Sequence, residues 1–282
     1  MSTSLPTIKI NKKILRELGY VLEGTLCIPD TIDYKDKKYL ITKIDKNGFR
    51  GCRKITRVSI PAAVTDIEPH AFARCSKLES VEYRGDANNQ LTRIHDNAFD
   101  WTHLNEISLP PNVLSLGRFA FSYNTHVTTI SLPNSLKTIE RFAFTNCPNV
   151  EHVVIPDSVE SLAYHAFDGC EGLQSVQMGH NIEDLEEGVF ADCWELTEFI
   201  IPEGVKRVHL RAFDGCANIK HVKIPSTVQE IYEGGWLWQS CMQYFTYNGS
   251  RDDWKDMWAN YNHDRIPLSQ PVKCLDGAVR SR

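Results

Sequence analysis

The sequence predicts an α/β repeat solenoid, and three observations support that prediction. An aromatic residue returns at a nearly constant interval along most of the 282 residues. Each interval repeats one order of apolar and polar residues, and within it the spacing changes from helix-like to strand-like. With 42% hydrophobic residues, the chain has enough apolar side chains for a continuous core.

Nine aromatic positions set the period. They are Phe49, Phe72, Phe99, Phe121, Phe144, Phe167, Phe190, Phe213 and Trp236. Successive members are separated by 23, 27 and 22 residues and then five times by 23 residues. A period of this length indicates a stack in which each unit covers the hydrophobic side of its neighbours.

Each unit is predicted to hold a short helix, a short strand and a turn, as "AFDGCANIKHVKIPSTVQEI" illustrates. The residues with helical spacing in this unit are Ala212, Phe213, Cys216 and Ile219. They would share one face of about two helical turns. Val222 and Ile224 then alternate with polar residues, as in a strand with one buried side, and Pro225 ends that strand.

Six of the nine cysteines lie three residues after a repeat aromatic. These are Cys52, Cys75, Cys147, Cys170, Cys193 and Cys216, and Asn124 takes the same place in another unit. Zinc sites need thiolates that converge on one ion, whereas these thiols would stack in a column. Parallel side chains on adjacent rungs also have the wrong torsion for a disulfide. We therefore expect a buried, reduced thiol ladder, with no metal and no cofactor.

The segments "AFARCSKLESVEY", "AFTNCPNVEHVVIPDSVESLAYHAFDGCEGLQSV" and "AFDGCANIKHVKIPSTVQEI" resemble the BspA-like leucine-rich repeats. The resemblance extends over roughly residues 24–277. It implies a leucine-rich-repeat solenoid with a parallel, concave β-sheet and short helices. The expected organisation is an entry and capping segment with the first rung over 1–48, repeats over 49–241, and a final rung with a Trp-rich cap over 242–282.

Two irregular segments have alternative interpretations. The unit after Arg84 is four residues longer than its neighbours and contains "RGD", which is either an ordinary surface loop or an integrin-type adhesion motif. Near the carboxy terminus, Ser250 and Asp253 are spaced as a helix capping box. The tryptophans nearby are Trp236, Trp238, Trp254 and Trp258. They form either a lid over the last rung or an aromatic platform for a sugar or peptide.

The residues that flank the buried strand pair are expected to point from the concave face. In the early units they are mostly small or hydrophilic, as in Arg57, Ser59, Ser80, Glu82, Glu106, Ser108, Thr129 and Ser131. The later units add the apolar and aromatic groups that interfaces favour. The predicted partner-binding residues are His152, Val154, Gln177, Ile200, His221, Lys223 and Tyr244.

Composition narrows the function further. The formal net charge is −5 and Lys and Arg are scattered, so we expect no nucleic-acid partner. No apolar run is long enough for a membrane span, and no phosphate loop or nucleophile motif predicts a catalytic residue. As written, "MSTSLPTIKINKK" lacks the apolar core of a signal peptide, which predicts a cytoplasmic protein, or a cell-surface or secreted one if the native chain is longer.

The sequence therefore predicts a non-catalytic protein–protein interaction module that binds a macromolecular partner on the concave leucine-rich-repeat face. One alternative is a cell-surface adhesin that binds host matrix proteins, and a further alternative is an enzyme. The sequence leaves the identity of the partner and the oligomeric state open.

Overall fold

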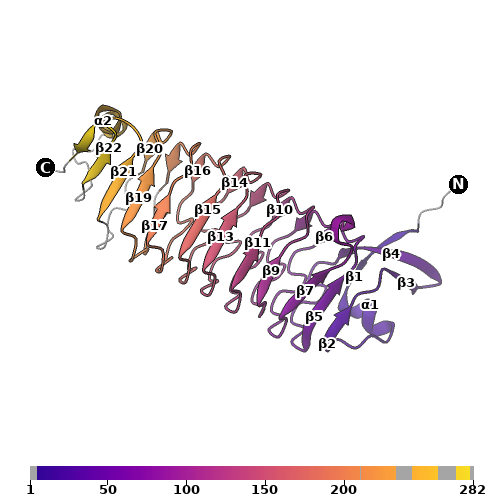
Figure 1. Ribbon diagram of the computed structural model, residues 1–282. Coiled ribbons are helices and arrows are strands. Elements are labelled where there is room, and N and C mark those ends of the chain that lie inside the picture. Colours follow the sequence, from indigo (N-terminus) through magenta and orange to yellow (C-terminus); the bar gives the residue numbers. More distant parts are fainter. Residues whose placement is uncertain (1–4, 210, 233–242, 260–270, 280–282) are drawn as a thin grey trace.

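The computed structural model describes residues 5–209, 211–232, 243–259 and 271–279, which form a parallel-strand solenoid of about nine coils (Figure 1). In the view of Figure 1 the coils follow one another along a nearly straight line, with the two termini at opposite ends. We name each coil by its repeat phenylalanine. The Phe72 coil, for example, runs from Ala71 to the residue before Ala98.

One side of the solenoid is a row of longer parallel strands, the long-strand row. Its members are β2 (Gly24–Cys27), β5 (Ile55–Ile60), β7 (Ser80–Tyr83), β9 (Glu106–Ser108), β11 (Thr129–Ser131), β13 (His152–Ile155), β15 (Ser175–Met178), β17 (Glu198–Ile200), β19 (His221–Ile224), β21 (Tyr244–Tyr247) and β22 (Val272–Cys274). Paired strands lie one repeat apart in register, so that Val154 lies beside Gln177 and Ile200 beside Lys223.

A second side is the short-strand row, in which most strands have two residues. It contains β4 (Lys37–Ile44), β6 (Asp66–Ile67), β8 (Arg93–Ile94), β10 (Ser115–Leu116), β12 (Thr138–Ile139), β14 (Ser161–Leu162), β16 (Asp184–Leu185), β18 (Arg207–Val208) and β20 (Glu230–Ile231). These strands also pair in parallel, as Leu116 with Ile139 shows. Both rows therefore pass hydrogen bonds from coil to coil.

The remaining elements lie mainly at the ends. At the amino-terminal end, β1 (Thr7–Ile10) and β3 (Thr31–Tyr34) flank β4, next to helix α1 (Lys12–Glu17). Helix α2 (Arg251–Ala259) and β23 (Gly277–Val279) lie at the carboxy-terminal end, where β23 pairs antiparallel with β22. A 3-10 turn, η1 (Asp86–Asn88), lies in the longer Phe72 coil.

The third side consists of turns, so the prediction of a short helix in every repeat is wrong. In each coil from Phe49 to Phe213, the residues two before and two after the phenylalanine have a left-handed φ of 52–74°. Two left-handed residues within five positions break a right-handed helix. Alternate N–H groups instead donate to the next coil, as Phe72 does to the Ala98 carbonyl (2.8 Å) and Arg74 to the Asp100 carbonyl (2.7 Å).

A column of phenylalanines forms the centre of the core. The rings from Phe49 to Phe213 are at most 1% exposed, and successive rings stack with centroids 5.1–6.0 Å apart. Because every coil places the same ring in the same place, the predicted period is the structural period.

The cysteine ladder lies beside this column. The Sγ atoms of Cys75, Cys147, Cys170, Cys193 and Cys216 each lie 3.1–3.5 Å from the carbonyl oxygen of the preceding coil's phenylalanine. Asn124 donates from Nδ2 to the equivalent Phe99 carbonyl at 2.9 Å. Burial raises the pKa of Cys75 and of Cys147 to about 12, so these thiols stay protonated and can donate. Thr102, which the repeat pattern did not predict, takes this position in the Phe99 coil.

At the carboxy-terminal end, the predicted capping box is confirmed. Asp253 N–H donates to Ser250 Oγ at 3.1 Å, and Ser250 N–H donates to Asp253 Oδ2 at 3.0 Å. Trp254 is buried and its ring lies 5.1 Å from that of Tyr247, which supports the lid interpretation for this residue. Trp236, Trp238 and the side chain of Trp258 lie outside the described residues.

Candidate partner-binding face

The long-strand row buries every second residue and exposes the flanking ones. In β13, for example, Val153 is buried while His152 and Val154 are exposed. This alternation follows from the two-residue period of an extended strand. The predicted outward positions are exposed or half-buried along the row, with one exception described below.

The seven predicted binding residues occur on five successive coils of this row, and we call them the late-coil patch. They are His152, Val154, Gln177, Ile200, His221, Lys223 and Tyr244. His221 and Tyr244 are half-buried, and the other five are exposed. Val154 and Ile200 are 55% and 59% exposed and lie two coils apart, roughly 10 Å at the usual strand spacing. The patch therefore presents two separated aliphatic groups among polar and aromatic ones.

Contacts between coils hold the aromatic end of the patch in place. The His221 ring stacks on Tyr244 with centroids 4.5 Å apart, and its Nε2 lies 2.9 Å from Thr246 Oγ1. Lys273 Nζ lies 4.0 Å from the centroid of the Tyr244 ring. Burial lowers the pKa of His221, which favours the neutral imidazole. These contacts fix the two rings at this end of the patch against neighbouring coils.

Two imidazole–hydroxyl pairs on this face resemble part of a catalytic dyad. His152 Nδ1 lies 2.8 Å from Ser175 Oγ, and His221 Nε2 faces Thr246 in the same way. A working dyad also needs a group that orients the second ring nitrogen. Within the described part of the chain, no carboxylate hydrogen-bonds either of these histidines. The pairs thus have hydrogen bonds that fix the rings but lack the third member of a triad.

The early coils differ from prediction at Ser59, which is 5% exposed rather than outward-facing and accessible. Arg84, in the Phe72 coil, reaches the Ile28 carbonyl and the Asp30 carboxylate in the entry segment. Ser59 pairs with Cys27 of the same entry segment, and its carbonyl accepts from Ile28 N–H at 3.0 Å. The contacts of Arg84 commit the arginine of "RGD" to the protein itself, so the adhesion interpretation of that tripeptide has no support from its geometry.

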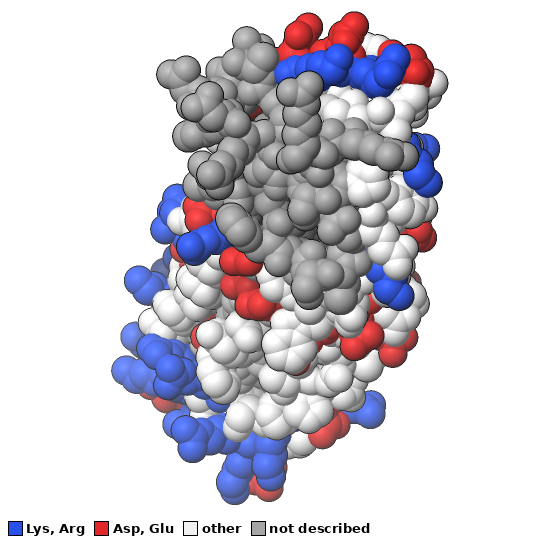
Figure 2. Space-filling view, turned by 90° about the vertical axis from the view of Figure 1, so that its left-hand side faces the viewer, with Lys and Arg blue, Asp and Glu red and all other residues white. Residues whose placement is uncertain are grey.

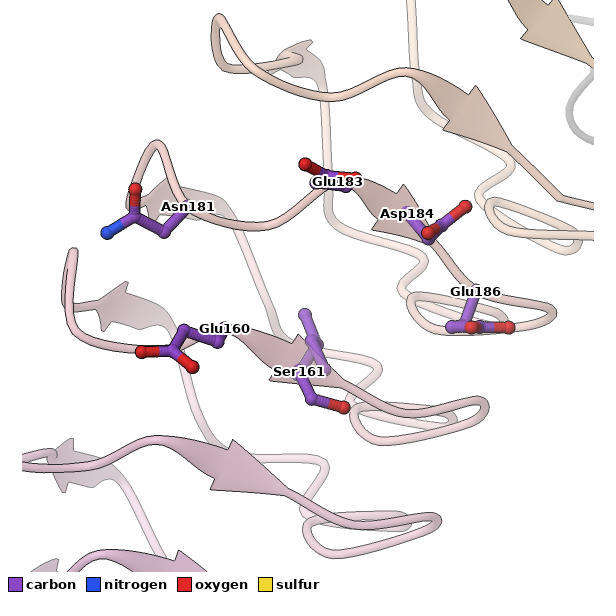
Figure 3. A pocket seen from close by; sticks show the side chains of 7 residues that line it. Glu160, Ser161, Asn181, Glu183, Asp184 and Glu186 are labelled. Carbon is purple, nitrogen blue, oxygen red and sulfur yellow. The ribbon is translucent and has the colours of Figure 1, made fainter.

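An acidic hollow of about 350 Å³ lies on the short-strand row between β14 and β16 (Figure 3). Its labelled side chains spread along the two coils and do not converge on one point. Lys137 pairs with Glu160 at 2.6 Å, Lys206 with Glu183 at 2.8 Å, and Arg207 with Asp184. Neighbouring coils thus neutralise three of its carboxylates. Among the described residues, no group of His, Cys, Asp and Glu is arranged to hold a metal ion.

On the molecular face seen from the carboxy-terminal side (Figure 2), charged groups of both signs are scattered among uncharged residues. Figure 2 shows Lys and Arg at the lower left and bottom edges, with Asp and Glu among them and uncharged residues between. Within the described segments, neither helix has the length and apolar composition needed to cross a bilayer.

A second hollow, on the turn side of the early coils, was not found from the sequence. It is lined by Trp101, which is 51% exposed, and by Tyr123 and two arginines. Trp101 lies two residues after Phe99, where several other coils have glycine, and that departure was the signal available in the sequence.

Comparison with known proteins identifies the family. The model for the BspA type leucine-rich repeat region matches residues 42–171 and 137–250, in six copies. No curated protein sequence matches the chain.

Three solved structures have the same fold. A leucine-rich repeat protein from Bacteroides ovatus is 23% identical with a TM-score of 0.60, and the match covers 81% of this chain and 64% of that protein. A leucine-rich repeat protein from T. pallidum is 30% identical with a TM-score of 0.54, covering 62% of this chain and 79% of the other. One from Eubacterium ventriosum is 17% identical with a TM-score of 0.52, covering 76% and 57%. The chain thus spans less than two thirds of the length of the first and third of these.

Proposed function

This chain belongs to the BspA type leucine-rich repeat family, and from that premise we propose that it is a non-catalytic module that binds a protein partner through the late-coil patch. Repeat solenoids are suited to this role because every coil contributes residues to one continuous surface. The observation that carries the proposal is the exposure of Val154 and Ile200 on strands whose equivalents in β9 and β11 present only Glu, Ser and Thr.

The surroundings of these two residues support an interface. Single exposed aliphatic residues are common on any protein. Here they share a face with the stacked pair of His221 and Tyr244, and with Lys223 at the rim. Aromatic and aliphatic groups surrounded by polar ones are typical of the centre and rim of a protein interface. A partner with an apolar side chain and hydrogen-bond acceptors around it would fit this arrangement.

The test is a double substitution, Val154→Glu with Ile200→Glu. Both side chains are mostly exposed, so the free energy of unfolding should change by less than about 0.5 kcal/mol per site. In an interface they would become buried, unpaired carboxylates, and we expect the affinity to fall by about 100-fold or more. The partner would be captured from a lysate, purified, and its Kd measured by calorimetry for both forms of the protein.

The matched control is Ser108→Glu with Ser131→Glu, which adds the same charge to exposed positions of the early coils. Ser59 would be unsuitable because it is buried. The proposal is wrong if the late pair leaves the Kd unchanged, or if the serine pair weakens binding as much.

A further inference from the structure

The turn side of the early coils contains an open hollow of about 350 Å³ that spans four consecutive coils. We call it the turn-edge hollow. It is lined by Arg53, Arg74, Ser76, Trp101, Thr102, His103, Tyr123 and Thr125. It lies outside the late-coil patch, so it bears on a binding activity separate from the function proposed above.

A half-exposed indole dominates the hollow. Tyr123 covers one face of Trp101, with centroids 4.5 Å apart and planes within 12°. About half of the Trp101 surface remains exposed, and it lines the hollow. Next to it, the rings of His103 and His126 stack with centroids 4.4 Å apart. The result is an aromatic wall of two stacked ring pairs, built from two adjacent coils.

In this wall, three large side chains stand on residues with a left-handed backbone. Arg74, Trp101 and Tyr123 lie two residues after their repeat phenylalanines and have φ values of 60°, 53° and 56°. At this position the other coils use residues that tolerate a left-handed backbone, namely Gly51, Asn146, Gly169, Asp192 and Gly215. Large side chains are uncommon in this conformation, although Phe119, Phe142 and Arg211 also have it, two residues before their repeat phenylalanines. Three adjacent coils accept it, and all three side chains face the same hollow.

The other notable groups are two exposed cations, Arg53 and Arg74. Neither guanidinium forms a salt bridge within the described residues, but Arg74 interacts with nearby Asp100: burial raises the pKa of that carboxyl, and the charge of Arg74 partly offsets this. A guanidinium binds a carboxylate through two parallel hydrogen bonds. Ser76, Thr125 and His103 add hydroxyl and imidazole groups that can bond to ligand hydroxyls.

We propose that the turn-edge hollow binds a carboxylated sugar. The exposed indole offers a flat apolar surface for the C–H face of a pyranose ring, the two arginines match a carboxylate, and the hydroxyl groups match the sugar's hydroxyls. A single-stranded nucleic acid also stacks on aromatic rings, but it needs a cationic groove that follows several phosphates. Here both arginines come from the two coils on the amino-terminal side of one stacked pair, and Asp100 directly precedes Trp101. The number of charges therefore favours a single acidic sugar unit over a phosphate chain.

Two pairs of probes would test this in calorimetric titrations. The first is 3′-sialyllactose against lactose, and the second is trigalacturonate against a neutral galactose trisaccharide. We expect at least one acidic probe to bind about tenfold or more tightly than its neutral partner, because charge-assisted hydrogen bonds are lost in the neutral sugar. Equal binding of acidic and neutral sugars, binding of neither acidic sugar, or tighter binding of an oligothymidylate would overturn the proposal.

Three variants connect binding to these residues. Trp101→Gly removes the ring at a position where glycine relieves the backbone, and Arg53→Gln with Arg74→Gln removes both cations without changing the wall. Each should weaken binding of the acidic sugar by about tenfold or more. Trp194→Ala is the matched control, since Trp194 is 48% exposed on a later coil and lies near Asp192. If Trp194→Ala weakens binding as much as Trp101→Gly, the site is wrong. If Trp101→Gly does not fold, the double variant Arg53→Gln with Arg74→Gln still tests the site.

Discussion

Two adjacent positions of the same turn follow opposite rules. The position three residues after the repeat phenylalanine points inward and holds only Cys, Thr or Asn from the Phe49 to the Phe213 coil. The position two residues after it points outward and holds Gly, Arg, Trp, Tyr, Asn or Asp. The inward side chain is small, and in most coils it donates to the phenylalanine carbonyl of the preceding coil, whereas Thr102 donates to the Phe99 carbonyl of its own coil. The outward side chain does not enter the core column, although neighbours can touch, as Trp101 and Tyr123 do, so the backbone conformation is the main limit on it.

This contrast shows where binding specificity can arise in such a molecule. An inward substitution disturbs a column whose rings are separated by only 5–6 Å, and so affects three coils. An outward substitution changes the surface and leaves the column intact. The late-coil patch and the turn-edge hollow both consist mainly of outward side chains, which agrees with the proposed roles.

The largest expected effect comes from shifting the inward columns out of register. Deletion of residues 144–166 removes 23 residues and joins Ala143 to Phe167, so every later coil keeps its pattern. We expect a folded but less stable protein, because each coil contacts mainly its neighbours. Deletion of residues 144–155 should place strand residues in turn positions and prevent folding. Circular dichroism and thermal unfolding distinguish the two, and similar behaviour of both deletions would contradict the structural role of the period.

The next largest effect should come from the network of ion pairs and hydrogen bonds around one buried carboxylate of the short-strand row. Asp66 in β6 is 2% exposed and contacts Thr65, Lys43, Arg93 and His95. Burial alone would raise the pKa of Asp66, but these hydrogen bonds outweigh it and hold the pKa well below its usual range. Asp66→Asn should lower the free energy of unfolding by about 2–3 kcal/mol at pH 7.

The pH dependence has a definite sign. Because the folded-state pKa is depressed, the stabilisation by Asp66 is complete above the unfolded value of about 3.9 and is lost as the pH falls below it. Denaturant unfolding between pH 7 and pH 2 should therefore show a smaller acid-induced loss for Asp66→Asn than for the unsubstituted protein. Asp184→Asn is the matched control, since that carboxylate has Arg207 and His209 as partners but is more exposed. An equal loss from both substitutions would show that burial does not determine the effect.

A smaller effect is expected within the cysteine ladder. Cys170 is fully buried and its Sγ lies 3.3 Å from the Phe144 carbonyl. Cys170→Ser puts an imperfectly satisfied hydroxyl in that place and should cost about 1–3 kcal/mol. Cys274 is only half-buried, and Cys274→Ser should cost less than about 0.5 kcal/mol. Equal shifts of the melting temperature would disprove the inward rule.

The smallest effect concerns the outward position itself. Arg74 has φ of 60°, so Arg74→Gly should be more stable than Arg74→Ala by about 1 kcal/mol, since only alanine retains the left-handed penalty. In an ordinary helix or strand the order would be reversed. Chemical denaturation of the two variants measures the difference. Greater stability of the alanine variant would show that the backbone conformation does not limit which residue occupies this position.

The sequence was a sound guide to the inward positions because each coil repeats one packing problem. Phe144, Cys170 and Val153 could be placed from spacing alone. The turns could not, because the left-handed positions hold Phe119 or Trp101 as often as glycine, and helical spacing of apolar residues fits a compact turn equally well. Ser59 was also misplaced. It pairs with Cys27 of the entry segment, whose sequence does not follow the repeat pattern.

The hydrogen bonds between successive turns also have a mechanical consequence. Around each phenylalanine on the turn side, alternate N–H groups donate from one coil to the carbonyls of the next, as Phe49 donates to Ala71 and Phe72 to Ala98. A pull on the two ends loads these bonds and the strand pairs one interface at a time. A coil that detaches releases 23 residues, or roughly 80 Å of extended chain. Under tension, the solenoid would lengthen in steps of nearly equal size. When the tension is released, the detached coils would refold onto those that are still folded.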